Sequence, residues 1–242
     1  MSAYNHTVAS ITLRAAMGRK RALLFAIPPL ILIGTSAALR LSHPASAAWP
    51  ARILGEFGFS VVLPLTALII GTSVIGAEIE DGSIVGMLAT PVRRSSVILT
   101  KFAVASVATI VFAAVPELIA GLIATGGVTP LAVGLFAGAV AGSLIYSAVF
   151  VSLAAATPRA LAAGLFYVLL WEGVLASSVG GARMLSAGHY SLAVANSVAH
   201  DAALDPGMGL ATACVLGTVV TITALAAAIR KLSSFSLRGE GA

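Results

Sequence analysis

Six apolar stretches, each about 20 residues or longer, constrain the fold of this chain more than any other feature. A helix needs about 20 apolar residues to cross the hydrocarbon core of a bilayer. Inside lipid the backbone has no water to bond with, so such stretches must be helical. The sequence therefore predicts an all-α membrane protein with six transmembrane helices, which cover residues 22–41, 57–77, 102–124, 131–156, 160–179 and 208–229.

The composition agrees with an integral membrane protein and excludes a soluble domain. Charged residues make up 10% of the 242 residues and hydrophobic residues 59%, whereas a soluble domain carries roughly 25% charged residues. Basic residues are in excess, but no basic face is interleaved with aromatic residues, so nucleic acid is not expected as a partner. The single cysteine, Cys214, excludes an internal disulfide and a cysteine metal site. We expect one transmembrane domain, residues 1–242, surrounded by lipid.

Basic residues predict the orientation of the helices, because loops rich in Lys and Arg stay on the cytoplasmic side. With the N-terminus inside, both termini are cytoplasmic, residues 1–21 and 230–242. Only Thr157-Pro158-Arg159 marks the turn between the fourth and fifth helices; without that turn, a five-helix chain would have its C-terminus outside. Three basic residues then lie outside, Arg40, Arg52 and Arg183, and eleven inside: Arg14, Arg19, Lys20, Arg21, Arg93, Arg94, Lys101, Arg159, Arg230, Lys231 and Arg238.

A cleaved signal peptide is the competing interpretation of the N-terminus. Basic residues, an apolar run and the small residues 45–47 resemble a cleavage site. The apolar run of about 20 residues is longer than the 7–15 of a signal core, so we expect a retained first helix. The residues before it fit either a short helix on the inner membrane surface or a plain cytoplasmic tail.

The sequence lacks the motifs of a catalytic or ATP-binding site. Gly71 and Gly76 have the spacing of a phosphate-binding loop, but Ala77 and Glu78 stand where Lys and Ser or Thr would reach phosphate and Mg²⁺. No Gly-x-Ser-x-Gly elbow is present. The histidines have no metal-ligand spacing: His6, His43, His189 and His200. We predict no catalytic residue, metal ligand or cofactor in this chain.

Two carboxyl groups fall inside predicted helices. Glu172 lies about 18 Å along the fifth helix, near the bilayer centre, and Glu117 follows Pro116, which can kink the third helix. Acids inside a membrane are costly to bury, so both are candidates for the transport pathway. The alternative is that each acid is protonated or hydrogen-bonded where helices meet, without a role in transport.

Small residues and one long connection complete the predicted bundle. Gly134, Gly138 and Gly142 recur every four residues on one face of the fourth helix, a spacing that lets helix backbones approach closely, within one subunit or across a dimer. The segment 180–207 is far longer than an ordinary connection and half apolar. We expect it to dip back into the membrane as short outer helices; a folded extracellular loop is the alternative.

A charged segment separates the second and third predicted helices. It carries Glu78, Glu80, Asp81, Arg93, Arg94 and Lys101 within residues 78–101. Gly82 permits a bend, Ser83 can cap a new helix, and Pro91 ends it after the apolar stripe of Ile84, Met87 and Leu88. We expect a short amphipathic helix presented to a cytoplasmic partner. The alternative is a loop whose charges only hold the orientation of the chain.

This segment, EIEDGSIVGMLATPVRRSSVILTK, resembles the coupling loop of ATP-binding-cassette (ABC) type-2 permeases. The residues that match the family pattern are Glu80, Gly82, Leu88, Pro91, Val92, Arg94 and Lys101. The departures are mild: Ser83 stands for Thr, Ile84 and Met87 stand for Leu, and Arg93 replaces a small residue. The six-helix layout and the long outer segment extend the similarity over most of the chain, but only the loop is specific.

The resemblance implies a permease subunit of an ABC exporter in the cytoplasmic (inner) membrane. In such permeases the loop forms a coupling helix in a cleft of a separate ATPase subunit, which binds ATP and Mg²⁺. Two permeases, expected to be identical, and two ATPases build one exporter, here of an amphipathic or hydrophobic compound such as a drug or antibiotic. The coupling residues are then Glu80, Gly82, Ser83, Ile84, Met87, Leu88, Pro91 and Arg94.

Two other classes of function compete with this interpretation. The first is an ion-coupled secondary carrier with Glu172 as its proton site. The second is a membrane enzyme, which is disfavoured because the sequence has no nucleophile–base pair. A carrier would purify alone, whereas a permease would copurify with an ATPase.

Overall fold

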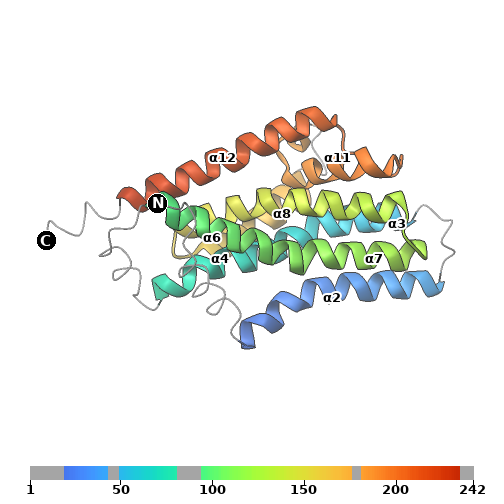
Figure 1. Cartoon of the computed structure of the whole chain (residues 1–242), viewed down its shortest axis with the longest axis horizontal. Coiled ribbons are helices and arrows are strands. Elements are labelled where there is room, and N and C mark those ends of the chain that lie inside the picture. Colours follow the sequence, from blue (N-terminus) through green and yellow to red (C-terminus); the bar gives the residue numbers. More distant parts are fainter. Residues whose placement is uncertain (1–18, 43–48, 81–93, 176–180, 235–242) are drawn as a thin grey trace, which may run out of the picture.

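The computed structural model of the chain describes residues 19–42, 49–80, 94–175 and 181–234. Within these ranges every regular element is a helix, as the sequence predicts. The long helices run side by side along one axis, and α12 crosses the bundle obliquely (Figure 1). We call the end of the bundle that carries the turn at Gly126 the Gly126 end, and the opposite end, which carries Arg159, the Arg159 end.

Three of the long paths through the bundle are built from more than one helical type. The segments η1, η2 and η3 are π-helical and continue directly into their neighbours, and η4 is a short 3₁₀ helix. In chain order the elements are α2 (Arg19–Ser42), α3 (Trp49–Ile53), η1 (Leu54–Val62), α4 (Leu63–Glu80), α6 (Arg94–Thr109), η2 (Ile110–Ala114), α7 (Val115–Thr125), α8 (Pro130–Ala156), α9 (Ala160–Phe166), η3 (Tyr167–Leu175), η4 (Ala182–Leu185), α11 (Ala187–Ala199) and α12 (Leu210–Ser234).

Five of the six predicted membrane helices are present at spanning length. Those long and apolar enough to cross a membrane are Phe25–Ser42, Trp49–Ile75, Arg94–Thr125, Pro130–Ala156 and Leu210–Leu232. The remaining prediction, residues 160–179, corresponds to the shorter apolar helix Ala160–Val174. A helix of that length rises about 22 Å, which is less than the roughly 30 Å of a hydrocarbon core. The structure therefore supports five candidate spans by length and composition.

Local sequence explains the two turns that bound α8. At the Gly126 end, Gly126 ends α7 with a φ of 78°, a conformation that glycine adopts without strain. Thr129 then caps α8 by accepting a hydrogen bond from the backbone nitrogen of Ala132. At the Arg159 end, α8 stops at Ala156, because the residue before Pro158 is restricted to an extended conformation. A new helix begins at Ala160, so the sequence 157–159 does form a turn.

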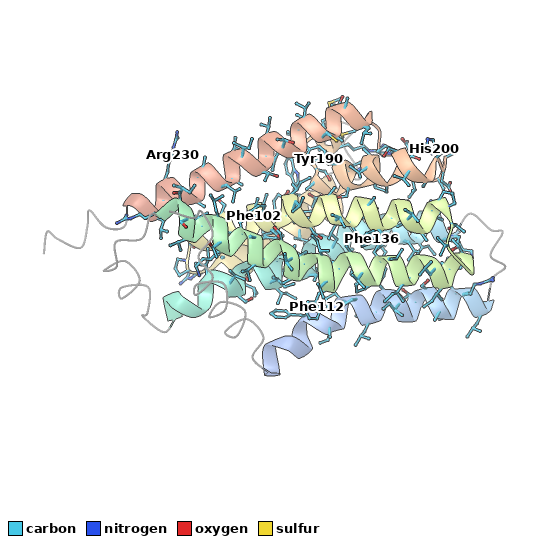
Figure 2. The ribbon with its side chains drawn as sticks, in the orientation of Figure 1. Phe102, Phe112, Phe136, Tyr190, His200 and Arg230 are labelled. Carbon is cyan, nitrogen blue, oxygen red and sulfur yellow. The ribbon has the colours of Figure 1, made fainter. Side chains whose placement is uncertain are left out.

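The centre of the bundle is α8, which packs against α4, α7, α11 and α12. Its core side chains include Tyr146 and Phe150, whose rings stack 5.9 Å apart. On the periphery, Phe112 of η2 extends toward α2 (Figure 2), where its ring lies 6.1 Å from that of Phe25. The serine hydroxyl of Ser36 in α2 also donates a hydrogen bond of 2.7 Å to the carbonyl of Ala120 in α7. These contacts fix α2 to one side of the central helix layer.

The glycine stripe of α8 lies against α11. A methyl carbon placed on Gly134 would be 2.5 Å from the carbonyl oxygen of Ala195, and one on Gly138 would be 2.5 Å from that of Ser191. Because residue numbers rise along α8 as they fall along α11, the two helices run antiparallel. Glycine is required at these positions, since no side-chain carbon fits between the backbones. Within this chain, the stripe therefore seats α11 on the half of α8 nearer the Gly126 end.

Candidate functional site

Most of the predicted ATPase-coupling residues lie outside the described residues. These are Gly82, Ser83, Ile84, Met87, Leu88 and Pro91, together with the side chain of Glu80, whose backbone ends α4. Arg94 is described, and it begins α6. The two described ends of the loop, α4 and α6, lie at the Arg159 end of the bundle (Figure 1).

Two cations tie α6 to its neighbours at this end. The Arg94 guanidinium donates a hydrogen bond of 2.9 Å to the carbonyl oxygen of Leu232, in the last turns of α12. Carbonyls there lack partners within the helix, and a cation is favoured near a helix C-terminus. Lys101, only 2% exposed, donates a hydrogen bond of 2.8 Å from Nζ to the carbonyl oxygen of Val74 in α4. The base of α6 is therefore joined to both α4 and α12.

The buried position of Lys101 was missed by the sequence analysis, which counted it among the basic residues of the cytoplasmic side. In the structure it lies two turns inside α6, facing α4. The signal available in the sequence was its distance from Arg94: seven residues place two side chains on nearly the same face of a helix, two turns apart. A lysine so far into an apolar helix must find an acceptor within the protein.

The second polar cluster surrounds Glu172, which is 3% exposed. Three donors converge on its carboxylate: the Tyr167 hydroxyl at 3.2 Å, the backbone nitrogen of Ala187 at 3.1 Å and the Ser186 hydroxyl. Ionised Glu is an acceptor only, so this arrangement suits the carboxylate form. The last two donors belong to the N-terminal end of α11, because Ser186 is the N-cap residue of that helix. A carboxylate is favoured there by the partial positive charge of the helix end.

Two further oxygen atoms border the Glu172 cluster. A methyl carbon placed on Gly188 would lie 3.2 Å from the Glu172 carboxylate, 3.2 Å from the carbonyl oxygen of Phe59 and 3.4 Å from the hydroxyl of Tyr146. The Tyr146 hydroxyl is buried and has no hydrogen-bond partner among the described residues. Tyr190 points from α11 toward α12 (Figure 2), and its hydroxyl donates to the carbonyl of Met184. Four helical segments therefore meet at this carboxylate: η1, α8, η3 and α11.

Glu117, the other predicted intramembrane acid, lies in α7 and is 2% exposed. It packs against the backbone of η1: a methyl carbon on Gly58 would lie 2.6 Å from each carboxyl oxygen. Its Oε1 atom has no hydrogen-bond partner among the described residues. An unbonded oxygen in such a place is costly if the group is charged, so this environment favours the neutral acid. The two acids thus have opposite surroundings. Three donors bond the carboxylate of Glu172, whereas Oε1 of Glu117 has no hydrogen-bond partner among the described residues.

The structure does not bring Glu117 and Glu172 into one site, but it places both beside the same π-helical segment. Glu117 contacts Gly58, and the Glu172 cluster borders the next residue, Phe59. Glu172 itself belongs to the π-helical η3, and Glu117 follows the π-helical η2 by three residues. Wide helical turns of this kind are rare and frequent at functional sites. Sequence patterns did not indicate them.

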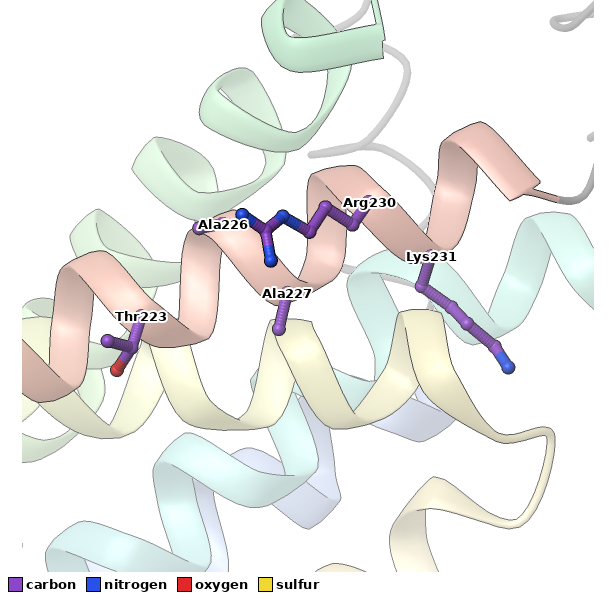
Figure 3. Close-up of a pocket in the computed structure, with 5 residues that line it drawn as sticks. All are labelled: Thr223, Ala226, Ala227, Arg230 and Lys231. Atoms are coloured by element: carbon purple, nitrogen blue, oxygen red, sulfur yellow. The ribbon is translucent and has the colours of Figure 1, made fainter.

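An open groove lies on α12 near the Arg159 end (Figure 3). Its lining residues all belong to that helix: Thr223, Ala226, Ala227, Arg230 and Lys231. A groove formed by one helix encloses nothing. Over the described ranges, no group of three His, Cys, Asp or Glu side chains could hold a metal ion. Within the described residues, neither this open groove nor a cluster of metal-binding side chains therefore offers a site for a cofactor.

The comparison with protein families gives one match. A family model described as "ABC-2 family transporter protein" matches residues 4–176, which is more than two thirds of the chain. The match includes the charged loop, Glu117 and Glu172, and it ends before α11 and α12. No curated protein matches the chain.

Proposed function

The chain belongs to the ABC-2 transporter family, and from this premise we propose that it is the permease subunit of an ABC exporter driven by a separate ATPase subunit. The family match over residues 4–176 is the observation that carries the proposal. The matched residues include the charged segment 78–101, which resembles a coupling loop. A permease that relies on a separate ATPase needs no phosphate-binding loop of its own. The partner subunit would bind ATP and Mg²⁺.

Charge distribution supports the proposed orientation, with both termini in the cytoplasm. Eight of the described basic residues are expected inside. Arg19, Lys20 and Arg21 begin α2, whose other end carries Arg40. The other five lie toward the Arg159 end: Arg94, Lys101, Arg159, Arg230 and Lys231. Arg40 and Arg52 are at the Gly126 end, where Arg40 lies beside Gly126 itself. The Arg159 end is then cytoplasmic. In this orientation α9 and η3 rise from the cytoplasmic side as the fifth of six membrane segments.

The contacts of α6 support a route from the ATPase into the membrane. The proposed coupling residues lie in the loop that joins α4 to α6, with the apolar side chains Ile84, Met87 and Leu88 docking into a cleft of the ATPase. Since Lys101 bonds α4 and Arg94 bonds α12, a displacement of the loop would move three helices together. We assign Arg94 an anchoring role on α12 within this route.

The substrate class follows from the apolar character of the bundle. The exposed side chains of α9 and η3 include large apolar ones, among them Leu165, Phe166 and Leu169. Such surfaces suit an amphipathic or hydrophobic compound that moves between two permease copies. A complex of two identical permeases and two ATPases is the simplest assembly of this kind.

Coexpression of the chain with an ATP-binding-cassette ATPase, sought among the genes that neighbour its own, tests the proposal. Purification through a tag on the permease should recover both subunits. In lipid vesicles, the complex should hydrolyse ATP faster when candidate hydrophobic compounds are added. Recovery of the permease alone, with uptake driven by a proton gradient, would instead support a secondary carrier that uses Glu172.

A further inference from the structure

Two short helical paths in succession cover the length of α8. At the Arg159 end, α9 lies beside α8 and α4: a methyl carbon on Gly164 would be 3.3 Å from the Leu153 side chain. At the Gly126 end, α11 lies on the glycine stripe, from Gly142 to Gly134. Both paths run from the Arg159 end toward the Gly126 end, since both are antiparallel to α8. The segment α9–η3 rises about 24 Å and α11 about 20 Å, together close to the roughly 40 Å of α8.

The two paths meet inside the protein rather than at its surface. Tyr146, which borders the meeting point, lies about 24 Å from the start of α8, and it is fully buried. Glu172, Ser186 and Ala187 are also buried. Because the first amide groups of a helix have no partner within it, a buried N-terminus needs an acceptor from elsewhere. Glu172 is that acceptor, through the backbone nitrogen of Ala187.

We propose that Glu172 is a positioning residue that fastens the start of α11 to η3, so that α9–η3 and α11 form one discontinuous membrane segment. The hydrogen bonds from Ser186 and Ala187 cross the break in the segment. Tyr167 holds the same carboxylate from within η3. The outer half of the segment, α11, then stays in place on α8 only while this junction is closed. The outward orientation of α11 rests on the proposed function, whereas the junction itself does not.

The junction adds a polar fastening at one end of the close contact between α8 and α11. The groups nearest the glycines of α8 include the backbone carbonyls of Ser191 and Ala195, the Ser191 hydroxyl and the methyl group of Ala195. Gly188 extends the same face of α11 and fits closely against Phe59 and Tyr146. The polar junction lies at this end of the contact, where it holds the start of α11 in place on α8.

Hydrogen exchange on the intact permease in lipid nanodiscs tests the junction. Glu172→Leu should raise the exchange rate of the Ala187 amide about tenfold or more, since it removes the acceptor of that amide. The amides of His189 and Tyr190 keep their acceptors on Ser186, so the exchange rates of the rest of the first turn, up to residue 190, should rise less, through the loosened start of α11. Glu172→Gln keeps one oxygen for Ala187 and should raise the rate less. Exchange in α8 should stay unchanged in both variants, whereas a general loss of stability would raise it as well.

Glu117→Leu is the matched control, because it removes a buried acid that contacts Gly58 of η1 rather than the start of α11. It should leave the exchange of residues 187–190 as in the native protein. If Glu172→Leu yields no folded protein, Ser186→Ala removes one crossing bond and the helix cap while it keeps the acid, and it should show the same local effect. Unchanged exchange in both junction variants would overturn the proposal, and so would an equal increase with Glu117→Leu. Copurification of the ATPase, measured on the same samples, tests the proposed function separately.

Discussion

The carboxyl group of Glu117 occupies the space that a side chain at Gly58 would need. Both carboxyl oxygens lie 2.6 Å from the point where a methyl carbon on Gly58 would stand. The two residues belong to α7 and to the π-helical η1, which are far apart in the sequence. The contact therefore locks the second membrane path against the third in the middle of the bundle.

Gly58→Ala should destabilise the permease by about 1–3 kcal/mol, the usual cost of overpacking a close contact. Thermal unfolding in detergent, followed by the loss of monodisperse protein, measures the change. Gly34→Ala is the control, because the corresponding methyl carbon in α2 meets no atom within 4 Å. That variant should be neutral or slightly stabilising, since alanine favours a helix over glycine. Shortening the acid in a Gly58→Ala, Glu117→Ala double variant should restore stability; equal losses in the single and double variants would contradict the contact.

Arg94→Gln should loosen the end of α12 without releasing the ATPase. The guanidinium bonds the carbonyl of Leu232, so its loss should raise amide exchange severalfold in the last turns of α12. Arg159→Gln is the control at the same end of the bundle, because Arg159 is exposed and its side chain makes no capping bond. Both variants should retain the ATPase on purification, since the apolar stripe of the loop is intact. Loss of the ATPase from Arg94→Gln, with unchanged exchange in α12, would assign Arg94 to the subunit interface instead.

The apolar lengths of the sequence predicted the helical class and six spanning helices, of which five are present at spanning length, because hydrophobic burial in lipid depends on local composition. The short fifth segment was predicted as residues 160–179, and only Ala160–Val174 is present as a described apolar helix. Short helices expected within residues 180–207 are present as η4 and α11. The junction of α11 with η3 could not be predicted, since the bond from Ala187 to Glu172 joins residues 15 positions apart across a break. The contact between Gly58 and Glu117 could not be predicted either, because it too joins residues that are far apart in the sequence. Such pairs depend on how helices are arranged in space, which periodicity does not specify.

Cysteine labelling tests the proposed orientation. In a Cys214→Ser background, Val128→Cys should react with a membrane-impermeant maleimide added to intact cells, because Val128 is 82% exposed in the turn at the Gly126 end. Arg159→Cys, on the exposed turn at the other end, should react only after the membrane is permeabilised. If only Arg159→Cys reacted in intact cells, the bundle would have the opposite orientation in the membrane. Reaction of both positions in intact cells would exclude the arrangement of α8 as a single crossing.

The strongest test of the coupling loop compares two substitutions five residues apart. Leu88→Glu puts a charge into the apolar stripe that we propose to dock into the ATPase. Burial of one such side chain is worth about 1.5–3 kcal/mol, so the charge should abolish copurification of the ATPase. Arg93→Ser brings the loop closer to the family pattern and should leave the complex intact. The permease itself should fold in both cases, because the loop lies outside the predicted helices, and gel filtration in detergent checks this. A coupled ATPase that still copurifies with Leu88→Glu would refute the docking of this stripe. A loss with both variants would mean that Arg93 holds the partner together with the apolar stripe.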